Sequence, residues 1–130
     1  MEKDHGTIRS RLAEDSSLRM HSTDDENQGK TAVTHFRVLR RLQKFSALEV
    51  TLETGRKNQI RAHLSEMGHP IVGDRAYGSS QNPLGMLGLH AFQLGFKHPV
   101  SGKPLMFRTD PPPEFRKYLP IADCGLRTAD

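Results

Sequence analysis

Leu52-Glu53-Thr54-Gly55-Arg56-Lys57-Asn58-Gln59-Ile60-Arg61-Ala62-His63-Leu64 is the stretch in which a strand is predicted to end and a helix to begin. Ser46 to Glu53 alternate between apolar and polar side chains, which is typical of a strand with one buried face. From about Asn58 to Met67 the apolar residues recur at helical spacing, which predicts an amphipathic helix. Thr54 is expected to cap this helix and Gly68 to end it, because hydroxyl residues and glycine are preferred there.

Cationic and amide side chains crowd the predicted first turns of this helix: Arg56, Lys57, Asn58, Gln59 and Arg61. A helix N-terminus already carries a partial positive charge, so cations there lower helix stability unless an anion lies in front of them. The pattern therefore predicts a phosphate or carboxylate partner. The alternative is internal pairing of Arg56 and Arg61 with carboxylates of the same chain: Glu53, Glu66 or Asp74.

The rest of the chain predicts two hairpins. Thr31 to Leu42 alternates and would pair with Ser46 to Glu53, while Leu89 to Lys97 would pair with Pro104 to Arg108. Residues 114–119, which follow three prolines, are predicted to form a short helix. The expected fold class is α+β, with a mixed, mostly antiparallel sheet and a central helix.

Three segments are expected along the chain. Residues 1–30 form an N-terminal segment with a short strand at Thr7 to Leu12 and a polar loop, residues 31–119 carry the periodic structure, and residues 120–130 form a tail. Residues 31–119 hold 13 Lys and Arg against 6 Asp and Glu, within a chain of net charge +4. This uneven charge favours a polyanionic partner such as nucleic acid, with a solvated basic surface as the alternative.

Composition excludes several classes of protein. At 130 residues with 35% hydrophobic residues, the chain is at most one ordinary domain. Cys124 has no intramolecular partner for a disulfide, which favours a reducing cytoplasmic location. No apolar run approaches the roughly 18 residues of a membrane span, so we expect no membrane partner.

Other chemistries find little support in the residues. The spacing of His63 and His69 does not place both rings on one helical turn, and no cysteine or carboxylate stands at metal-ligand spacing, so no metal site is predicted. No glycine-flanked serine elbow and no glycine-rich nucleotide loop occur. Gly73-Asp74 is typical of a tight turn in which the carboxylate bonds nearby N–H groups. The alternative is that Asp74 contributes to binding.

Four stretches together resemble the RluA-type RNA pseudouridine synthases. Residues 52–64 resemble the element LETGRxxQIRxHL of this family, and residues 68–78 resemble GHPxxGDxxYG. Residues 89–99 are similar to LHAxxLxFxHP, and residues 31–39 to AxTxYxVL. The resemblance covers roughly residues 6–119, with the elements in the same order and register.

This resemblance implies a function. Enzymes of the family flip a uridine out of RNA, either ribosomal or transfer RNA, and isomerise it to pseudouridine without a cofactor or metal. Arg61 matches the arginine that pairs with the catalytic aspartate, a role in which it keeps a nucleophilic carboxylate ionised. The expected RNA-binding residues are Arg56, Lys57, Asn58, Gln59 and Arg75.

One departure from the family is decisive for activity. The catalytic aspartate belongs to an HRLDxxTSG element, and no His-Arg-Leu-Asp occurs in this sequence. Residues 31–119 are therefore expected to be the C-terminal half of a catalytic domain, inactive alone. A missing N-terminal half, or self-association through the uncovered sheet, would complete it. The alternative is a non-catalytic RNA-binding remnant that uses the basic loop and helix at residues 55–63.

Overall fold

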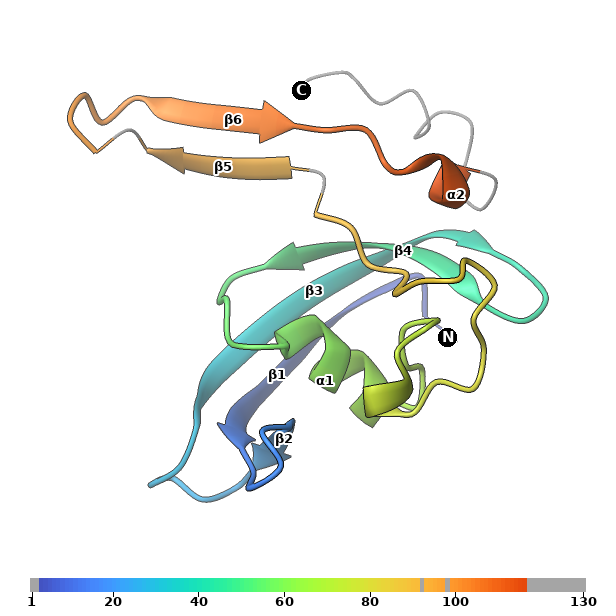
Figure 1. Ribbon diagram of the computed structural model, residues 1–130. Coiled ribbons are helices and arrows are strands. Elements are labelled where there is room, and N and C mark those ends of the chain that lie inside the picture. Colours follow the sequence, from blue (N-terminus) through green and yellow to red (C-terminus); the bar gives the residue numbers. More distant parts are fainter. Residues whose placement is uncertain (1–2, 92, 98, 117–130) are drawn as a thin grey trace. The chain divides into compact units, whose positions relative to one another are not determined.

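A computed structural model describes residues 3–91, 93–97 and 99–116 of the chain (Figure 1). Contacts divide the chain into two compact units, one ending at Gly88 and the other beginning at Leu89. The boundary expected at residue 30 does not coincide with this division, because the strands before residue 30 belong to the same sheet as those after it.

The first unit contains a four-stranded antiparallel sheet of order β2-β1-β3-β4. Its strands are β1 (His5–Glu14), β2 (Met20–Thr23), β3 (Lys30–Arg41) and β4 (Ser46–Leu52). The pairing of β1 with β3 extends from His5 opposite Arg37 to Leu12 opposite Lys30. This confirms the antiparallel character of the expected sheet and the hairpin predicted for its third and fourth strands.

The N-terminal thirty residues are more ordered than their sequence indicates. The predicted short strand at Thr7 to Leu12 is the centre of the longer β1, and β2 lies where a loop was expected. The loop prediction was wrong because β2 has only four residues and shows no extended alternation. It is held instead by pairing with β1 and by the burial of Met20, which is 9% exposed.

Helix α1 (Gln59–Glu66) lies across one face of this sheet (Figure 1). Asn58 precedes it in the left-handed region at φ 52°, and no side chain caps the helix. The prediction that Thr54 caps it was wrong, because the Thr54 hydroxyl accepts a hydrogen bond from Val33 N (2.9 Å) and bonds Oε1 of Gln59 (2.7 Å). Gly68, at φ 87°, follows the helix end as expected.

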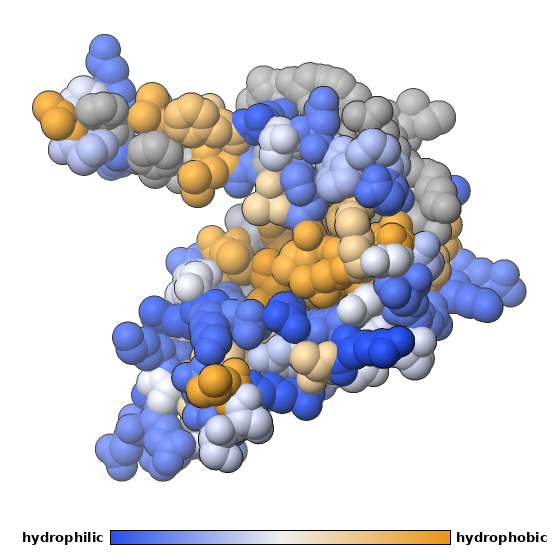
Figure 2. Space-filling view, viewed as in Figure 1, coloured by the Kyte–Doolittle hydropathy of each residue, from blue (hydrophilic) through white to orange (hydrophobic). Residues whose placement is uncertain are grey.

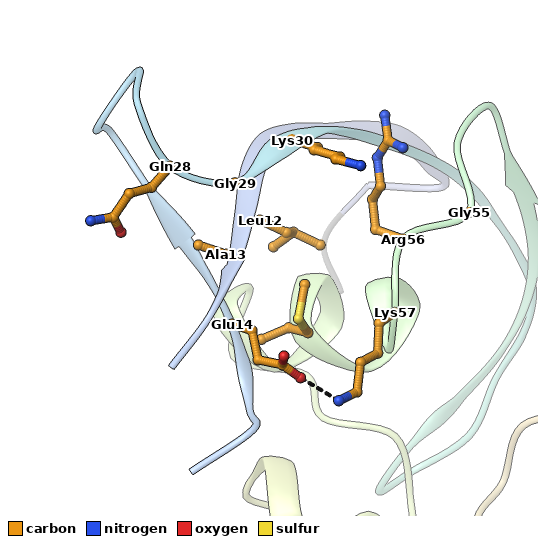
Figure 3. Close-up of a pocket in the computed structure, with 10 residues that line it drawn as sticks. Leu12, Ala13, Glu14, Gln28, Gly29, Lys30, Gly55, Arg56 and Lys57 are labelled. Atoms are coloured by element: carbon orange, nitrogen blue, oxygen red, sulfur yellow. Dashed lines mark hydrogen bonds and ion pairs between the residues drawn. The ribbon is translucent and has the colours of Figure 1, made fainter. Parts of the chain in front are cut away.

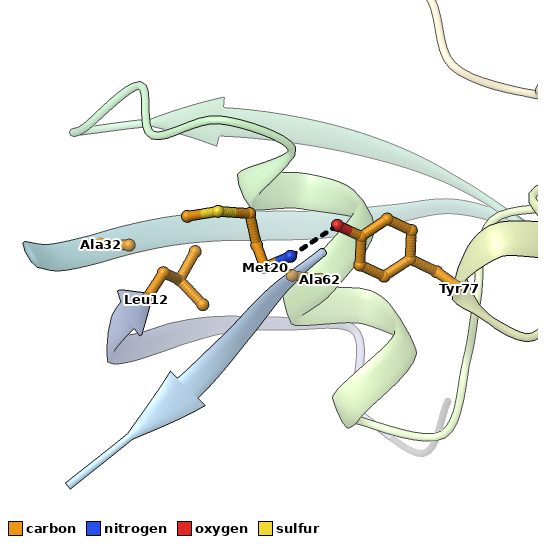
Figure 4. Packing of buried hydrophobic residues seen from close by; sticks show 5 residues of the cluster. All are labelled: Leu12, Met20, Ala32, Ala62 and Tyr77. Carbon is orange, nitrogen blue, oxygen red and sulfur yellow. Dashed lines mark hydrogen bonds between the residues drawn. The ribbon is translucent and has the colours of Figure 1, made fainter. Parts of the chain in front are cut away.

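The hydrophobic core of the first unit draws on five separate segments (Figure 4). Leu12 and Met20 lie beside Ala32 and Ala62, which are 0% and 1% exposed and let α1 approach the sheet closely. Tyr77, from the short 3-10 helix η1 (Arg75–Tyr77), closes the cluster, and its hydroxyl accepts a hydrogen bond from Met20 N at 3.0 Å. One aromatic ring thus connects the loop after α1 to the edge strand β2.

The second unit pairs β5 (Gln93–Lys97) with β6 (Pro104–Arg108) and adds α2 (Pro113–Arg116). Leu94 and Phe107 are directly opposite each other and are 62% and 56% exposed. The hairpin accordingly shows hydrophobic surface in Figure 2. Residues 117–119 of the predicted helix and the predicted tail at 120–130 lie outside the described residues.

We predict that Leu12→Ala destabilises the chain by about 2–5 kcal/mol, because it removes buried methyl groups and leaves a cavity between the sheet and α1. The free energy of unfolding from urea titration measures this. Leu18→Ala is the matched control, since Leu18 is 66% exposed and should change stability by less than about 0.5 kcal/mol. Equal effects of the two substitutions would contradict the described core.

Candidate functional site

Arg61 is the centre of the candidate site. Its Nε donates to Oδ2 of Asp74 at 3.0 Å and its Nη2 to Oδ1 at 2.9 Å, which makes a bidentate pair. The Asp74 side chain is fully buried, and the Arg61 side chain is 25% exposed. Nη1 of Arg61 donates to Oδ1 of Asn58 at 3.3 Å. The internal pairing that the sequence left open is therefore the one present for Arg61.

The surroundings of the pair keep Arg61 charged and fixed. The hydrogen bonds that Arg61 donates to Asp74 raise the pKa of Arg61 above its ordinary value, and burial opposes this only in part. The guanidinium also lies over the ring of Tyr77, 4.8 Å from its centroid. Gly73, at φ 81°, forms the tight turn that was predicted before Asp74, where a Cβ would lie 2.3 Å from the carbonyl oxygen of Met86. Backbone packing thus places the carboxylate in front of Arg61.

Arg61 retains capacity for a second acceptor. A guanidinium has five N–H donors, and the contacts with Asp74 and Asn58 occupy three of them. The other two belong to Nη1 and Nη2, at the end of the side chain. A quarter of the Arg61 side chain is exposed.

Two buried polar residues of α1 connect it to the sheet. The Gln59 amide donates to the Val33 carbonyl (3.0 Å) and to the Thr34 hydroxyl (2.8 Å). His63 is 0% exposed and lies between the Thr34 hydroxyl (2.8 Å from Nδ1) and the Ser10 hydroxyl (2.9 Å from Nε2). Since Thr34 already accepts from Gln59, its own proton is best placed on the bond to His63, which favours a neutral ring protonated at Nε2.

This network continues to the protein surface. The Ser22 hydroxyl lies 2.8 Å from that of Ser10 and donates to Glu66 at 2.6 Å, while the Ser22 N–H donates to the other Glu66 oxygen at 2.9 Å. No sequence pattern predicted this role for Ser10, Ser22 or Thr34. Their side chains are isolated in the sequence, and only the strand register and the helix position bring them together.

The other predicted site residues separate into buried and exposed ones. Gln59 is 2% exposed with its amide bonded internally, so its expected contact with RNA does not fit this structure. Arg56 is half-buried and its Nε donates to the Thr31 carbonyl at 2.9 Å. Lys57 is exposed and forms an ion pair with Glu14, and Arg75 is exposed on η1. Arg56 and Lys57 precede α1 instead of lying in its first turn.

Within the described ranges, no group of three His, Cys, Asp or Glu side chains could hold a metal ion. No helix among the described residues is long and apolar enough to cross a membrane.

The pattern of the family described as RNA pseudouridylate synthase matches residues 1–66, which is half of the chain. The chain therefore belongs to the RNA pseudouridine synthase family, of the RluA and RluD type. It is 37% identical over 128 residues to ribosomal large subunit pseudouridine synthase D of Neisseria meningitidis, covering 89% of this chain and 34% of the relative. It is 47% identical over 97 residues to an uncharacterized RNA pseudouridine synthase of Synechocystis, covering 72% and 30%.

A solved structure, human RNA pseudouridylate synthase domain containing 1, matches with a TM-score of 0.70 at 26% identity. The match covers 86% of this chain and 50% of the human one. The mostly antiparallel fold is thus that of pseudouridine synthases. The chain spans about a third of the length of the curated relatives named above, at 34% and 30%.

We predict that Asp74→Asn destabilises the chain by about 3 kcal/mol, because it leaves Arg61 beside a neutral amide in a partly buried position. Urea titration of Asp74→Asn, Arg61→Met and the double variant gives the coupling energy between the two side chains. We expect the double variant to be more stable than the sum of the single effects indicates. Strict additivity would show that the two side chains do not interact.

Stability should also depend on the protonation of His63. Burial lowers the pKa of His63 below its ordinary value, so the folded state holds the neutral ring. The associated stability is present above the unfolded pKa of about 6.5 and is lost as the pH falls below it, because the unfolded chain then binds the proton more readily. Urea titrations should show that the free energy of unfolding of wild type decreases between pH 7.5 and pH 5. In His63→Gln this decrease should be smaller. His69→Gln, at an exposed position, is the control and should retain the wild-type slope.

Proposed function

We propose that this chain forms part of the active site of an RNA pseudouridine synthase, which isomerises uridine to pseudouridine in ribosomal or transfer RNA. The observation that carries the proposal is the fixed guanidinium of Arg61, together with membership of the family. The proposed partners are RNA and the segment that bears the catalytic aspartate. We also propose a cytoplasmic location, and the reaction as proposed needs no cofactor.

In the proposed active site, Arg61 donates its two remaining N–H groups to the catalytic aspartate. An opposite charge at hydrogen-bond distance keeps a carboxylate ionised and oriented, which an attacking nucleophile requires. Asp74 acts as a positioning residue, because its bidentate contact fixes the plane of the guanidinium. Without it, Arg61 would sample several rotamers and present the second acceptor with a less defined geometry.

The proposed RNA-binding residues are Arg56, Lys57 and Arg75, of which Lys57 and Arg75 are exposed and Arg56 is half-buried. We include Asn58 with them; its side-chain oxygen accepts a hydrogen bond from Nη1 of Arg61. Phosphate contacts of this kind position the RNA without reading its sequence. Gln59 supports this surface from within the fold by accepting a hydrogen bond from Arg56 N at 3.0 Å.

We further propose that these 130 residues do not catalyse the reaction alone, because their sequence contains no His-Arg-Leu-Asp element. A segment bearing that element would supply the nucleophile and cover apolar surface such as the exposed face of the β5–β6 hairpin. Without such a segment we expect the chain to self-associate.

The second candidate function is a non-catalytic RNA-binding module that uses residues 55–63. One observation favours it: Arg61 already has a buried carboxylate partner within the chain, so the loop and helix are complete without a catalytic aspartate. Salt-dependent RNA binding by the isolated chain would support both candidates, and only complementation separates them.

The test is complementation. We expect no pseudouridine when the chain is incubated with a uridine-containing stem-loop, as measured by primer extension after carbodiimide treatment. Co-expression with the aspartate-bearing N-terminal half of a relative should restore product. Arg61→Ala should abolish that product, whereas Arg37→Ala, which removes an exposed arginine paired with Glu49, should not.

Product from the chain alone would refute the proposed inactivity. Failure of complementation, with RNA binding retained, would favour the binding module.

A further inference from the structure

An open pocket lies beside the loop that leads into α1, away from the Arg61–Asp74 pair. β1, β2, the β2–β3 turn and the loop before α1 all contribute to it, and its volume is about 740 Å³ (Figure 3). Leu12 and Met20 are buried and form its apolar floor. Lys30, Arg56 and Lys57 bring three cations from two separate segments to its rim. Of the residues that line it, Glu14 alone is acidic.

The pocket is held in shape by the strands around it. Arg11 fixes the β2–β3 turn by donating to the carbonyls of Glu26 (3.1 Å), Gln28 (3.1 Å) and Gly29 (3.0 Å). Gly29, at φ 69°, lies so close to β1 that a Cβ would be 2.5 Å from the carbonyl oxygen of Leu12. Lys30 follows directly, so its position relative to the floor is set by backbone contacts.

One of the three cations of the rim is paired with an anion that the chain itself supplies. Figure 3 shows Lys57 paired with Glu14 on one side of the floor, and Lys30 extending toward Arg56 on the other. Arg56 is anchored through Nε to the Thr31 carbonyl (2.9 Å), which directs its terminal nitrogens away from that bond. The Glu14 carboxylate is 38% exposed, so it can leave Lys57 at small energetic expense.

We propose that this pocket binds a phosphate of the RNA backbone between Lys30, Arg56 and Lys57, and that Glu14 occupies the partner position of Lys57 until the RNA displaces it. This inference rests on the proposed function and adds to it a further contact, Lys30, and an internal competitor, Glu14. Glu14 lowers affinity for RNA in general. It thereby limits the binding of RNA that does not also engage the rest of the surface.

The experiment measures affinity of the full 130-residue chain for a short uridine-containing RNA stem-loop over a series of salt concentrations. Glu14→Gln should tighten binding by about two- to fivefold, because Lys57 no longer has to leave an ion pair. Lys30→Gln should weaken binding and reduce the slope of log affinity against log salt by about 0.7–0.9, as expected for one lost phosphate contact.

Two matched controls separate the pocket from overall charge. Glu49→Gln frees Arg37 from an exposed ion pair in the same way, and Lys44→Gln removes a lysine from the turn between β3 and β4. Neither should change affinity or slope to a comparable extent. Equal effects of Glu14→Gln and Glu49→Gln, or of Lys30→Gln and Lys44→Gln, would overturn the inference while leaving the proposed function standing.

Two further outcomes are decisive. Absence of RNA binding by wild type at low salt would contradict both this inference and the RNA surface of the proposed function. Inorganic phosphate should compete for this one contact only, so it should weaken RNA binding by no more than Lys30→Gln does. Phosphate binding that Lys30→Gln removes while RNA affinity stays unchanged would assign the pocket to a small phosphate-bearing ligand instead of RNA.

Discussion

The attachment of α1 to the sheet through buried Gln59 and His63 is the constraint on which the rest of the structure depends. Both side chains converge on the Thr34 hydroxyl at 2.8 Å, and both are at most 2% exposed. A buried polar group without a partner is strongly unfavourable, so only one rotation and one axial position of α1 satisfy the two side chains together. The same contacts fix the loop before the helix, since Gln59 also accepts from Arg56 N.

The position of α1 in turn determines where Arg61 lies. Two residues before His63 on the same helix, Arg61 points away from the sheet toward the turn at Gly73 and Asp74. Asp74 does not use up the guanidinium, because a bidentate contact along one edge leaves the terminal edge free. In the proposed active site, an internal carboxylate and a catalytic one are therefore compatible partners, and the first would orient the arginine for the second.

Local signals in the sequence were sufficient for β3 and β4, for α1 and for the Gly73 turn, because alternation, helical spacing and glycine each have a direct structural cause. They failed for β2 and for the helix cap. β2 is too short to show a period. The Thr54 hydroxyl bonds Val33, which is distant in sequence, and the side chain of Gln59 instead of capping the helix. The apolar side chains of the β5–β6 hairpin indicate a surface to be covered, but they do not identify the segment or partner that covers it.

The candidate site shows the same limit. The polar residues between positions 56 and 61 indicated this segment, but sequence does not distinguish a buried amide from an exposed one. Gln59 and Arg61 are two positions apart, and one faces the sheet while the other reaches Asp74. The strand register places Ser10 and Thr34 beside His63, and Ser22 beside Ser10, which their positions in the sequence do not indicate.

The central claim is that Arg61 is held by Asp74 so that its terminal edge can receive the catalytic aspartate. The most direct measurement is a crystal structure of this chain bound to the aspartate-bearing N-terminal half of a relative. The account predicts an aspartate oxygen about 2.9 Å from a terminal nitrogen of Arg61, with the contact to Asp74 retained. Arg61 bonded only to Asp74 and Asn58, with the aspartate elsewhere, would contradict it.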